Sequence, residues 1–457
     1  MIKVGTICSG IGAPEKALRN LGIDYELAYF CELDKFAVQS YCAIHNVDPG
    51  KNLGDLTKVD IAALPHDLDL LVGGTPCQDF SNAGLRKGGE IGSGTRSSLM
   101  WNFVQIIREN KPKAILWENV PGCLTDKMRP NYDKFINALY DAGYKVHSKM
   151  LNSKYFGIPQ SRDRVYVLAI RKDIVTNFAM PTGYDCGICL KDILEETVDE
   201  KYFLTAAQIK SLMARTAKKK SKGMGFKFAP TDGSSLARTI TTHEAKIVDC
   251  NWIKKEVRCI ELIHGQAQGY RVYSVDGVSG TLSSNCGGLG ATAGLYLVPH
   301  DYNKGGLKDA DYCPSITTSG IQYNCFVIDL YNGTIRNDGM AGTLTTGTAY
   351  NGSGTFGVLV EVGQDGVRRY YRIRKLTPKE CFILMGFTDG DYKACKDAGI
   401  SNAQLYKQAG NSIVVNVLMA IFGELYSVAW QKKVYGDWYR SEEELLADLP
   451  LLKGVTK

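Results

Sequence analysis

The first 170 residues alternate between apolar, β-type runs and helical patterns, and this alternation restricts the fold more than any other feature of the chain. The runs that predict strands are Ile2–Cys8, Tyr25–Cys31, Leu68–Val72, Ala114–Trp117 and Arg164–Ile170. The patterns that predict helices are Pro14–Leu21, Asp34–His45, Leu99–Glu109 and Tyr132–Ala142. Strands that alternate with helices predict an α/β fold, a mostly parallel sheet with helices on both faces. Ligands bind such sheets beyond the carboxyl ends of the strands.

A different composition begins near residue 180. From about 230 to 360 the chain is rich in Gly, Ser, Thr and Tyr, and a short element recurs with irregular spacing. Its copies are Thr239-Ile-Thr-Thr, Thr281-Leu-Ser-Ser, Ser315-Ile-Thr-Thr and Thr343-Leu-Thr-Thr. Each copy precedes a polar loop and then an apolar run, namely Lys246–Val248, Gly294–Val298, Cys325–Leu330 and Gly357–Val360. This pattern predicts several hairpins in an inserted, largely β and loop-rich domain, and not a regular solenoid.

Helical patterns flank this insert. Thr205-Ala-Ala-Gln208 has the form of a capping box, and Thr377-Pro-Lys-Glu380 begins a helix with proline at its first position. Asn411–Tyr426 reads as a long apolar helix, which needs a large core such as the N-terminal sheet. We therefore expect a discontinuous domain of residues 1–178 and 404–457, with residues 179–403 inserted as a second domain.

The bulk composition is that of a soluble globular protein. The chain has 457 residues, 44% hydrophobic and 22% charged, and no apolar stretch long enough to predict a membrane span. Without an export signal, its 14 cysteines are expected to be reduced thiols in a cytosol. Cys186 and Cys189 form a CxxC without a second pair, so we expect no metal site.

The net charge of +6 permits a polyanionic partner without requiring one. Seven basic residues and no acidic one lie between Lys210 and Lys227. This stretch is either a solvated helix end and loop or an arm that contacts phosphates.

Gly-Gly-Thr-Pro76-Cys77-Gln78 follows the apolar run Leu68–Val72 directly. Two glycines and a proline predict a turn at the mouth of the strand, where a thiol can face a substrate. A structural cysteine lies more often inside an apolar run. The glycine-rich segment Gln78–Arg96 that follows is either a lid or a surface loop.

Other polar residues end the neighbouring predicted strands. Ser9-Gly10-Ile11-Gly12 follows the first, Glu32 ends the second, and Asp55 can end a further one, which together predict a nucleoside-type pocket. Each residue alone also fits an ordinary turn or cap.

Beside this pocket we place Glu118-Asn119-Val120 and Gln160-Ser-Arg162-Asp-Arg164. A buried glutamate beside a thiol suggests general acid chemistry, and two arginines one residue apart on a strand point the same way. An ordinary Glu–Arg ion pair is the structural alternative.

These pieces, in this order, resemble the DNA cytosine-5 methyltransferases of bacterial and phage type, over residues 1–175 and 368–430. The matching motifs are Ser9–Gly12, Pro76–Gln78, Glu118–Val120, Gln160 with Arg162 and Arg164, Arg374–Glu380 (one residue from the strictest spacing) and Gln408–Ser412. Many members carry an aromatic residue where this chain has Cys8. In that family the insert is the target-recognition region with a Thr-Leu element, and which copy is equivalent here stays open.

The resemblance implies a Rossmann-like methyltransferase domain that binds S-adenosyl-L-methionine. It implies cofactor contacts from Ser9, Gly10, Ile11, Gly12, Glu32, Leu33, Asp55, Leu56, Pro76, Leu99, Asn411 and Ile413. Glu32 would bind the ribose and Asp55 the adenine amino group. It implies contacts with double-stranded DNA from Gln78, Ser81, Arg96, Asn119 and Gln160.

The implied reaction methylates C5 of a cytosine flipped out of the duplex. Cys77 would add to C6, Glu118 would meet N3 and the amino group, and Arg164 would hold O2 with Arg162 supporting the loop. A cytoplasmic monomer without an obligate protein partner or a membrane is expected. The alternatives are a tRNA cytosine-5 methyltransferase, a catalytically silent DNA-binding regulator on the same fold, and a thiol oxidoreductase, for which Cys77 lacks a resolving partner.

Overall fold

The computed structural model describes residues 1–75, 99–220, 228–246, 251–262, 271–274, 326–329, 357–362 and 368–441. The chain divides into two compact units. Unit 1 comprises Met1–Ile193, Ser235–Ala245 and Pro378–Lys457, and unit 2 comprises Leu194–Ser234 and Lys246–Thr377. The change in composition along the chain predicts domain boundaries at 178/179 and 403/404. Packing instead assigns residues 179–193, 235–245 and 378–403 to unit 1.

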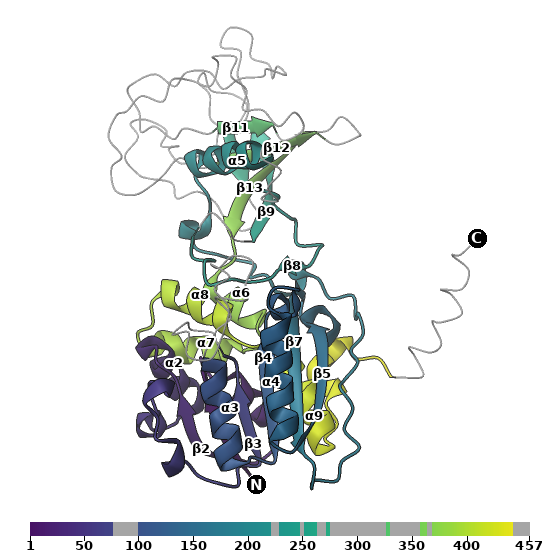
Figure 1. Ribbon diagram of the computed structural model, residues 1–457. Helices are drawn as coiled ribbons and strands as arrows, with labels where there is room; N and C mark the ends of the chain where they lie inside the picture. Colours follow the sequence, from purple (N-terminus) through teal and green to yellow (C-terminus); the bar gives the residue numbers. More distant parts are fainter. Residues whose placement is uncertain are drawn as a thin grey trace, which may run out of the picture. The chain divides into compact units, whose positions relative to one another are not determined.

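Unit 1 is built on a six-stranded sheet with the order β2-β1-β3-β4-β7-β5 (Figure 1). Its strands are β1 (Ile2–Ile7), β2 (Tyr25–Cys31), β3 (Leu70–Gly73), β4 (Ala114–Asn119), β5 (Tyr144–Asn152) and β7 (Asp163–Arg171). β1 pairs in parallel with β2 and β3, and β3 pairs in parallel with β4. β7 is antiparallel to both β4 and β5 and is the reversed strand of the sheet. The predicted α/β fold with a mostly parallel sheet is confirmed.

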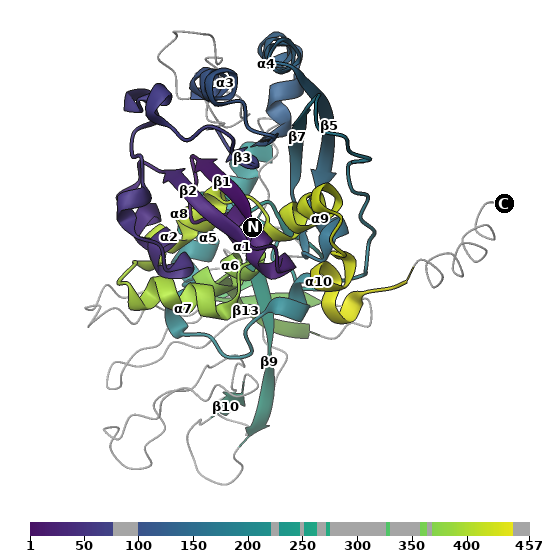
Figure 2. The same ribbon diagram turned by 90° about the horizontal axis from the view of Figure 1, so that it is seen from below.

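Helices cover both faces of this sheet. α3 (Leu99–Asn110) and α4 (Arg129–Asp141) lie on one face, and α1 (Ala13–Leu21) and α9 (Val415–Tyr426) lie on the other (Figure 2). Phe103 of α3 and Phe135 of α4 are fully buried in one core cluster with Leu71 and Ile115 of the sheet. The remaining helices of unit 1 are α2 (Lys35–His45), α6 (Pro378–Ile383), α7 (Asp389–Asp397), α8 (Asn402–Asn411) and α10 (Gln431–Tyr435).

The strand β5 was not predicted from the sequence. It alternates between buried Tyr144 and exposed positions such as Lys145 and Met150. As an edge strand of the sheet it has few fully buried side chains, so it lacks the apolar run by which the inner strands were recognised.

The predicted helix Asn411–Tyr426 is wrong at its start. α8 ends at Asn411, Ser412 and Val414 have extended backbone, and α9 begins at Val415. The side chain of Arg162 donates hydrogen bonds to the carbonyl groups of Gly410 and Ser412. These two carbonyl groups therefore have a hydrogen-bond partner that does not belong to either helix. Tertiary contact, and not local sequence, makes this break.

Within the described residues, the stretch Asn402–Tyr426 has the length and hydropathy of a membrane span. It consists of two helices, and 61% of the relevant window is buried inside the protein. α9 packs against α1. This burial is typical of a core helix in a folded domain.

Unit 2 holds a five-stranded sheet with the order β10-β9-β13-β12-β11. Its elements are α5 (Ala206–Lys220), β9 (Trp252–Leu262), β10 (Arg271–Ser274), β11 (Phe326–Asp329), β12 (Gly357–Val362) and β13 (Arg368–Lys375). α5 begins at the predicted capping box, in which the Thr205 and Gln208 side chains and backbone groups pair reciprocally. Leu212 of α5 packs with Trp252 and Ile373. The Thr281, Ser315 and Thr343 copies of the repeat lie outside the described residues, as do Val248 and Gly294–Val298.

Two glycines in helices of unit 1 offer a matched test of this packing. A Cβ atom on Gly423 of α9 would lie 2.5 Å from Cδ1 of buried Trp430, whereas a Cβ atom on Gly390 of α7 would meet nothing nearer than 3.7 Å. We expect Gly423→Ala to lower the free energy of unfolding by about 1–3 kcal/mol through overpacking. Gly390→Ala should raise it by about 0.5 kcal/mol, because alanine loses less backbone entropy on folding.

Urea unfolding of both variants and the wild type measures the two changes. Equal effects of the same sign would contradict the packing of α9 against Trp430.

Candidate active site

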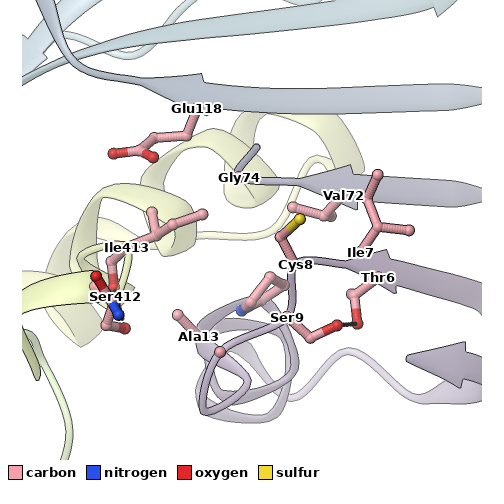
Figure 3. Close-up of a pocket in the computed structure, with 13 residues that line it drawn as sticks. Thr6, Ile7, Cys8, Ser9, Ala13, Val72, Gly74, Glu118, Ser412 and Ile413 are labelled. Carbon is pink, nitrogen blue, oxygen red and sulfur yellow. Dashed lines mark hydrogen bonds between the residues drawn. The ribbon is translucent and has the colours of Figure 1, made fainter. Parts of the chain in front are cut away.

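A pocket opens at the carboxyl edge of the sheet in unit 1, where β1 has β2 on one side and β3 on the other. Connections leave in opposite directions at such a switch point and create a crevice. The pocket is lined by Thr6, Ile7, Cys8, Ser9, Gly10, Ala13, Pro14, Val72, Gly74, Glu118, Asn411, Ser412 and Ile413 (Figure 3). The lining residues come from the β1–α1 turn, the ends of β3 and β4, and the loop between α8 and α9.

The β1–α1 turn requires glycine at two positions with left-handed backbone. Gly10 has φ 57° and Gly12 has φ 80°. A Cβ atom on Gly12 would lie 2.1 Å from Nε2 of His45, so no side chain fits there. A Cβ atom on Gly10 would meet no atom within 4 Å, so Gly10 keeps the backbone bare where it lines the pocket. Both predicted glycines therefore lie in the turn, but only Gly10 lines the pocket.

His45 supports this turn from α2. Its Nε2 lies 3.0 Å from the carbonyl oxygen of Ile11, and its Nδ1 lies 3.0 Å from Nη2 of Arg19. A carbonyl only accepts and a guanidinium only donates, so these contacts fit a neutral ring with the proton on Nε2. Burial, as the largest cause, and the nearby charge of Arg19 lower the pKa of His45, the Ile11 hydrogen bond raises it, and the net pKa is about 4.

Glu32 directly follows β2 and contacts the same turn. Its Oε2 accepts a hydrogen bond from the backbone N–H of Gly10 at 2.8 Å, and its Oε1 accepts one from Asp34 at 2.8 Å. Burial raises the pKa of Glu32, while these two hydrogen bonds lower it. Each carboxylate oxygen has a second lone pair, so the group can still accept hydrogen bonds from a diol.

Asp55 differs from its predicted place. In place of the strand expected before Asp55, the structure has a single β-bridge between Asn52 and Phe30. Asp55 caps a short 3-10 helix by accepting hydrogen bonds from the Thr57 backbone and hydroxyl at 3.0 and 2.7 Å, and these bonds lower its pKa. The segment is local turn structure because Asp favours caps over strands.

The other predicted cofactor residues separate into three groups. Ser9, Asn411 and Ile413 line the pocket. Ile11 and Leu56 are buried in the core, and Leu99 begins α3 packed against it. Leu33 is 73% exposed. Apolar residues beside a motif can fill either a core or a pocket, and sequence spacing does not distinguish the two.

Glu118 and Arg164 form an ion pair, with Nε of Arg164 3.1 Å from Oε1 of Glu118. The glutamate comes from the end of β4, and its carboxylate faces the pocket (Figure 3). Burial raises the pKa of Glu118, and the positive charges of Arg164 and Arg162 oppose that rise. The raised pKa makes this carboxyl group easier to protonate than one in water, which suits general acid chemistry.

Thr75, the last described residue before the predicted nucleophile turn, is fixed by two side chains of β4. The indole of Trp117 donates to its hydroxyl at 2.9 Å, and the amide of Asn119 donates to its carbonyl at 3.2 Å. Asn119 is 1% exposed, so its predicted DNA contact is wrong for this conformation: the side chain holds backbone instead. Predicted residues Pro76, Cys77, Gln78, Ser81 and Arg96 lie outside the described residues.

Gln160 is likewise buried, with no exposed surface. Its Nε2 donates to the carbonyl of Leu384 at 2.8 Å, and its Oε1 accepts from the backbone N–H of Ile240 at 2.8 Å. The predicted DNA contact of this side chain is therefore also corrected to an internal one. Arg162 is 3% exposed and donates hydrogen bonds to backbone carbonyls.

Cys8 lines the pocket, although it was not among the predicted cofactor residues. Burial, and the negative charge of Glu32, raise the pKa of its thiol. It therefore stays protonated and is a poor nucleophile at neutral pH. Thr6, Ile7, Ala13, Pro14, Val72, Gly74 and Ser412 were missed as lining residues. These residues lie beside the predicted strand ends and motifs, and this position is the sequence signal that could have identified them as lining residues.

Among the residues that the structure describes, no group of three or more His, Cys, Asp or Glu side chains could hold a metal ion.

The fold and pocket define a class of protein: a Rossmann-like α/β protein with a pocket at the topological switch point of its sheet. The sequence profile of one family, C-5 cytosine-specific DNA methylase, matches residues 2–427. The chain belongs to this family and is a DNA (cytosine-5) methyltransferase.

Relatives extend over nearly the whole chain. The orphan methyltransferases M.Rho11sI of Bacillus phage rho11s and M.SPRI of Bacillus phage SPR are 32% and 34% identical, each over 93% of this chain and 97% of the relative. The type II methyltransferase M.HhaI of Haemophilus parahaemolyticus is 28% identical over 90% of both chains.

Two solved structures share the fold. The Dnmt2 methyltransferase of S. pombe has a TM-score of 0.52 at 16% identity, over 93% of this chain and 99% of that one. The Entamoeba histolytica methyltransferase EhMeth has a TM-score of 0.54 at 16% identity, over 93% and 98% of the two chains.

The contacts of His45 predict a pH dependence of stability. Because its pKa is about 4 in the folded protein and near 6.5 in the unfolded chain, the unfolded chain binds the extra proton between these values. The stabilising effect is therefore complete above pH 6.5 and is lost as the pH falls towards 4, by up to about 3 kcal/mol.

His45→Gln keeps a donor for Ile11 but cannot titrate. The difference in free energy of unfolding between wild type and variant should therefore change between pH 6.5 and 4, as measured by denaturant unfolding at each pH. A constant difference across this range would show that His45 is not buried as a neutral ring.

Proposed function

We propose that this enzyme transfers a methyl group from S-adenosyl-L-methionine to C5 of a flipped cytosine, in a specific sequence of double-stranded DNA, through a covalent bond between Cys77 and C6. The observation that carries the proposal is the Glu118–Arg164 pair at the pocket. It lies at the end of β4, the strand whose Trp117 and Asn119 fix the residue two positions before Cys77.

The pocket residues fit the cofactor. Gly10 presents bare backbone, and the half-buried carboxylate of Glu32 retains acceptor capacity for a ribose diol. Asn411 and Ile413 would form the opposite wall, and Cys8 would take the place where many family members have an aromatic ring. S-adenosyl-L-methionine supplies an electrophilic methyl group.

Cys77 has the task of activating the cytosine. C5 of a pyrimidine is a weak nucleophile, and addition of a thiolate at C6 makes C5 enamine-like and able to attack an electrophile. The thiol is only a few per cent ionised near neutral pH, so the site must favour the thiolate. After methylation a base removes the C5 proton, the C5–C6 double bond re-forms, and the sulfur leaves as a thiolate.

Glu118 and Arg164 would bind the base during addition. Burial raises the pKa of Glu118, which favours the protonated carboxyl group and would help it to donate a proton towards N3. Arg164 can donate to O2 of the cytosine, since a guanidinium has five N–H groups and one already faces Glu118. Negative charge that develops on the ring is stabilised in this way.

The base must leave the helix to reach this pocket. Groups at the bottom of a crevice cannot approach a stacked, paired cytosine, and flipping costs a few kcal/mol. Phosphate contacts that offset this cost are expected from basic side chains. Lys210 and Lys218 are exposed on α5 of unit 2 and belong to the basic stretch that suits this task. Unit 2 is the proposed target-recognition domain, unit 1 the catalytic domain, and the enzyme is proposed to act in the cytoplasm as a monomer.

Double-stranded DNA is favoured over tRNA because the family description and the names of the relatives specify DNA methylation or type II methyltransferases. The long insert between the Arg164 and Arg374 motifs also favours DNA. A silent DNA-binding regulator is disfavoured because Glu118 and Arg164 remain paired at the pocket.

The direct test is transfer of labelled methyl groups from S-adenosyl-L-methionine to duplex DNA and to tRNA. We expect label in DNA alone, and bisulfite sequencing of DNA from expressing cells should place 5-methylcytosine in one or a few short motifs. Label in tRNA alone would overturn the choice of substrate, and label in neither would overturn the proposed function.

Cys77 and Cys8 form a matched pair for testing the nucleophile. Cys77→Ala should reduce methyl transfer by at least 10³-fold, because the covalent step is lost, while cofactor affinity stays within about threefold. Cys8→Ala should retain turnover, because the raised pKa of Cys8 keeps that thiol protonated.

Duplex DNA containing 5-fluorocytosine should form a stable adduct with wild type and Cys8→Ala but not with Cys77→Ala, as seen by denaturing gel electrophoresis and mass spectrometry. An adduct through Cys8 would assign the nucleophile to the other cysteine.

A further inference from the structure

The segment Ser235–Ala245, here called the strap, lies in unit 1 although the chain on both sides of it belongs to unit 2. It contains Thr239-Ile-Thr-Thr, the first copy of the repeated element. The contacts of the strap are specific and mostly buried, and the mechanism described above does not use them.

The first set of contacts joins the strap to the strand region before β7. β8 (Ala237–Arg238) pairs in parallel with β6 (Gln160–Ser161). The side-chain Oε1 of Gln160 accepts a hydrogen bond from the backbone N–H of Ile240 at 2.8 Å, and the hydroxyl of Thr239 donates one to the carbonyl of Ser161 at 2.8 Å. Ile240 is 1% exposed.

The second set joins the strap to the loop after α8. Nη1 of Arg162 donates to the carbonyl of Ile240 at 2.9 Å, and Nη2 of the same side chain donates to the carbonyls of Ser412 and Gly410 at 2.9 and 3.2 Å. A Cβ atom on Gly410 would lie 2.3 Å from the backbone carbon of Thr241. The strap and the end of α8 therefore approach each other backbone to backbone, and one buried guanidinium bridges the strap and the loop that follows α8.

This loop is a wall of the pocket. Asn411, Ser412 and Ile413 all line it, and the carbonyl that Arg162 holds belongs to Ser412. A loop with extended backbone between two helices has few hydrogen bonds of its own, so its position depends on such outside partners. Arg162 supplies one such partner, and the strap binds the same guanidinium through the carbonyl of Ile240 and packs on Gly410.

We propose that the strap is a positioning element for the cofactor pocket and does not read bases. Docked on Gln160, Arg162 and Gly410, it holds the Asn411–Ile413 wall in the conformation that binds the cofactor. The proposal rests on the proposed function for the identity of that ligand. The proposal also means that the Thr239 copy of the repeated element is not the copy that reads bases.

The exposure of the strap supports this assignment. Ile240 is buried and its backbone groups are bound within unit 1, whereas the side chains of Thr241 and His243 are exposed. If the strap read bases, its exposed side chains, which also include Ser235 and Arg238, would be the ones available to do so. If it positions the pocket wall, the buried partners should matter and the exposed side chains should not.

The test combines cofactor binding with mapping of the methylated sequence. Arg162→Lys removes the forked contact while keeping the charge, and Gln160→Leu removes both amide contacts. We expect each to raise the dissociation constant for S-adenosyl-L-methionine about tenfold or more, measured by titration calorimetry without DNA. Bisulfite sequencing should show the same methylated motif as the wild type.

Two milder substitutions of Thr239 control for misfolding. Thr239→Val loses the hydroxyl that donates to Ser161, while Thr239→Ser keeps it, so only the valine variant should weaken cofactor binding, by about threefold. Calorimetry also separates the two effects, because misfolded protein lowers the apparent number of sites, whereas a displaced wall changes the dissociation constant of the folded molecules.

Arg238→Ala and His243→Ala are the exposed controls, for which we expect unchanged cofactor affinity and an unchanged methylated motif. A changed motif in either control, or wild-type cofactor affinity in both Arg162→Lys and Gln160→Leu, would overturn the positioning role. If the wild type itself bound no S-adenosyl-L-methionine, the proposed function would fail instead.

Discussion

The architecture of unit 1 depends on one buried guanidinium. Arg162 lies next to β7 and binds backbone carbonyls from the strap and from the loop after α8, two segments that are more than 160 residues apart. A buried charge is costly unless hydrogen bonds satisfy it, and carbonyls in extended backbone need donors from elsewhere. The guanidinium supplies donors to these carbonyl groups, and the carbonyl groups in turn stabilise its buried charge. Arg162 therefore fixes the arrangement of three segments that are far apart in the sequence: its own, the strap and the loop after α8.

The pocket depends in turn on the switch point of the sheet. β1 pairs with β2 on one side and β3 on the other, so its following turn opens into a crevice. Gly12 allows that turn to pack on His45, and Gly10 leaves its backbone bare beside Glu32. Rigid elements behind the turn thus prepare a surface that can receive a nucleoside.

The family motifs contain two kinds of residue with different physical tasks. Glu118 and Arg164 form an ion pair at the pocket, where the pKa of Glu118 is raised, and the proposed function gives them the task of binding the base. Asn119, Gln160 and Arg162 are buried among the same motifs and bind backbone groups. Membership in a motif therefore does not by itself imply contact with a substrate, and burial with satisfied hydrogen bonds identifies the positioning residues.

The sequence by itself determined the α/β class, the inner strands and the polar residues at their carboxyl ends, because apolar period, glycine and proline act locally. It also identified Gly10, Glu118, Asn411 and Ile413, which line the pocket. The edge strand β5, the break at Ser412–Val414 and the docking of the strap became visible only in the tertiary structure. These features arise from partners distant in the chain, and neither hydrophobic period nor spacing records which backbone group a side chain such as Arg162 will bind.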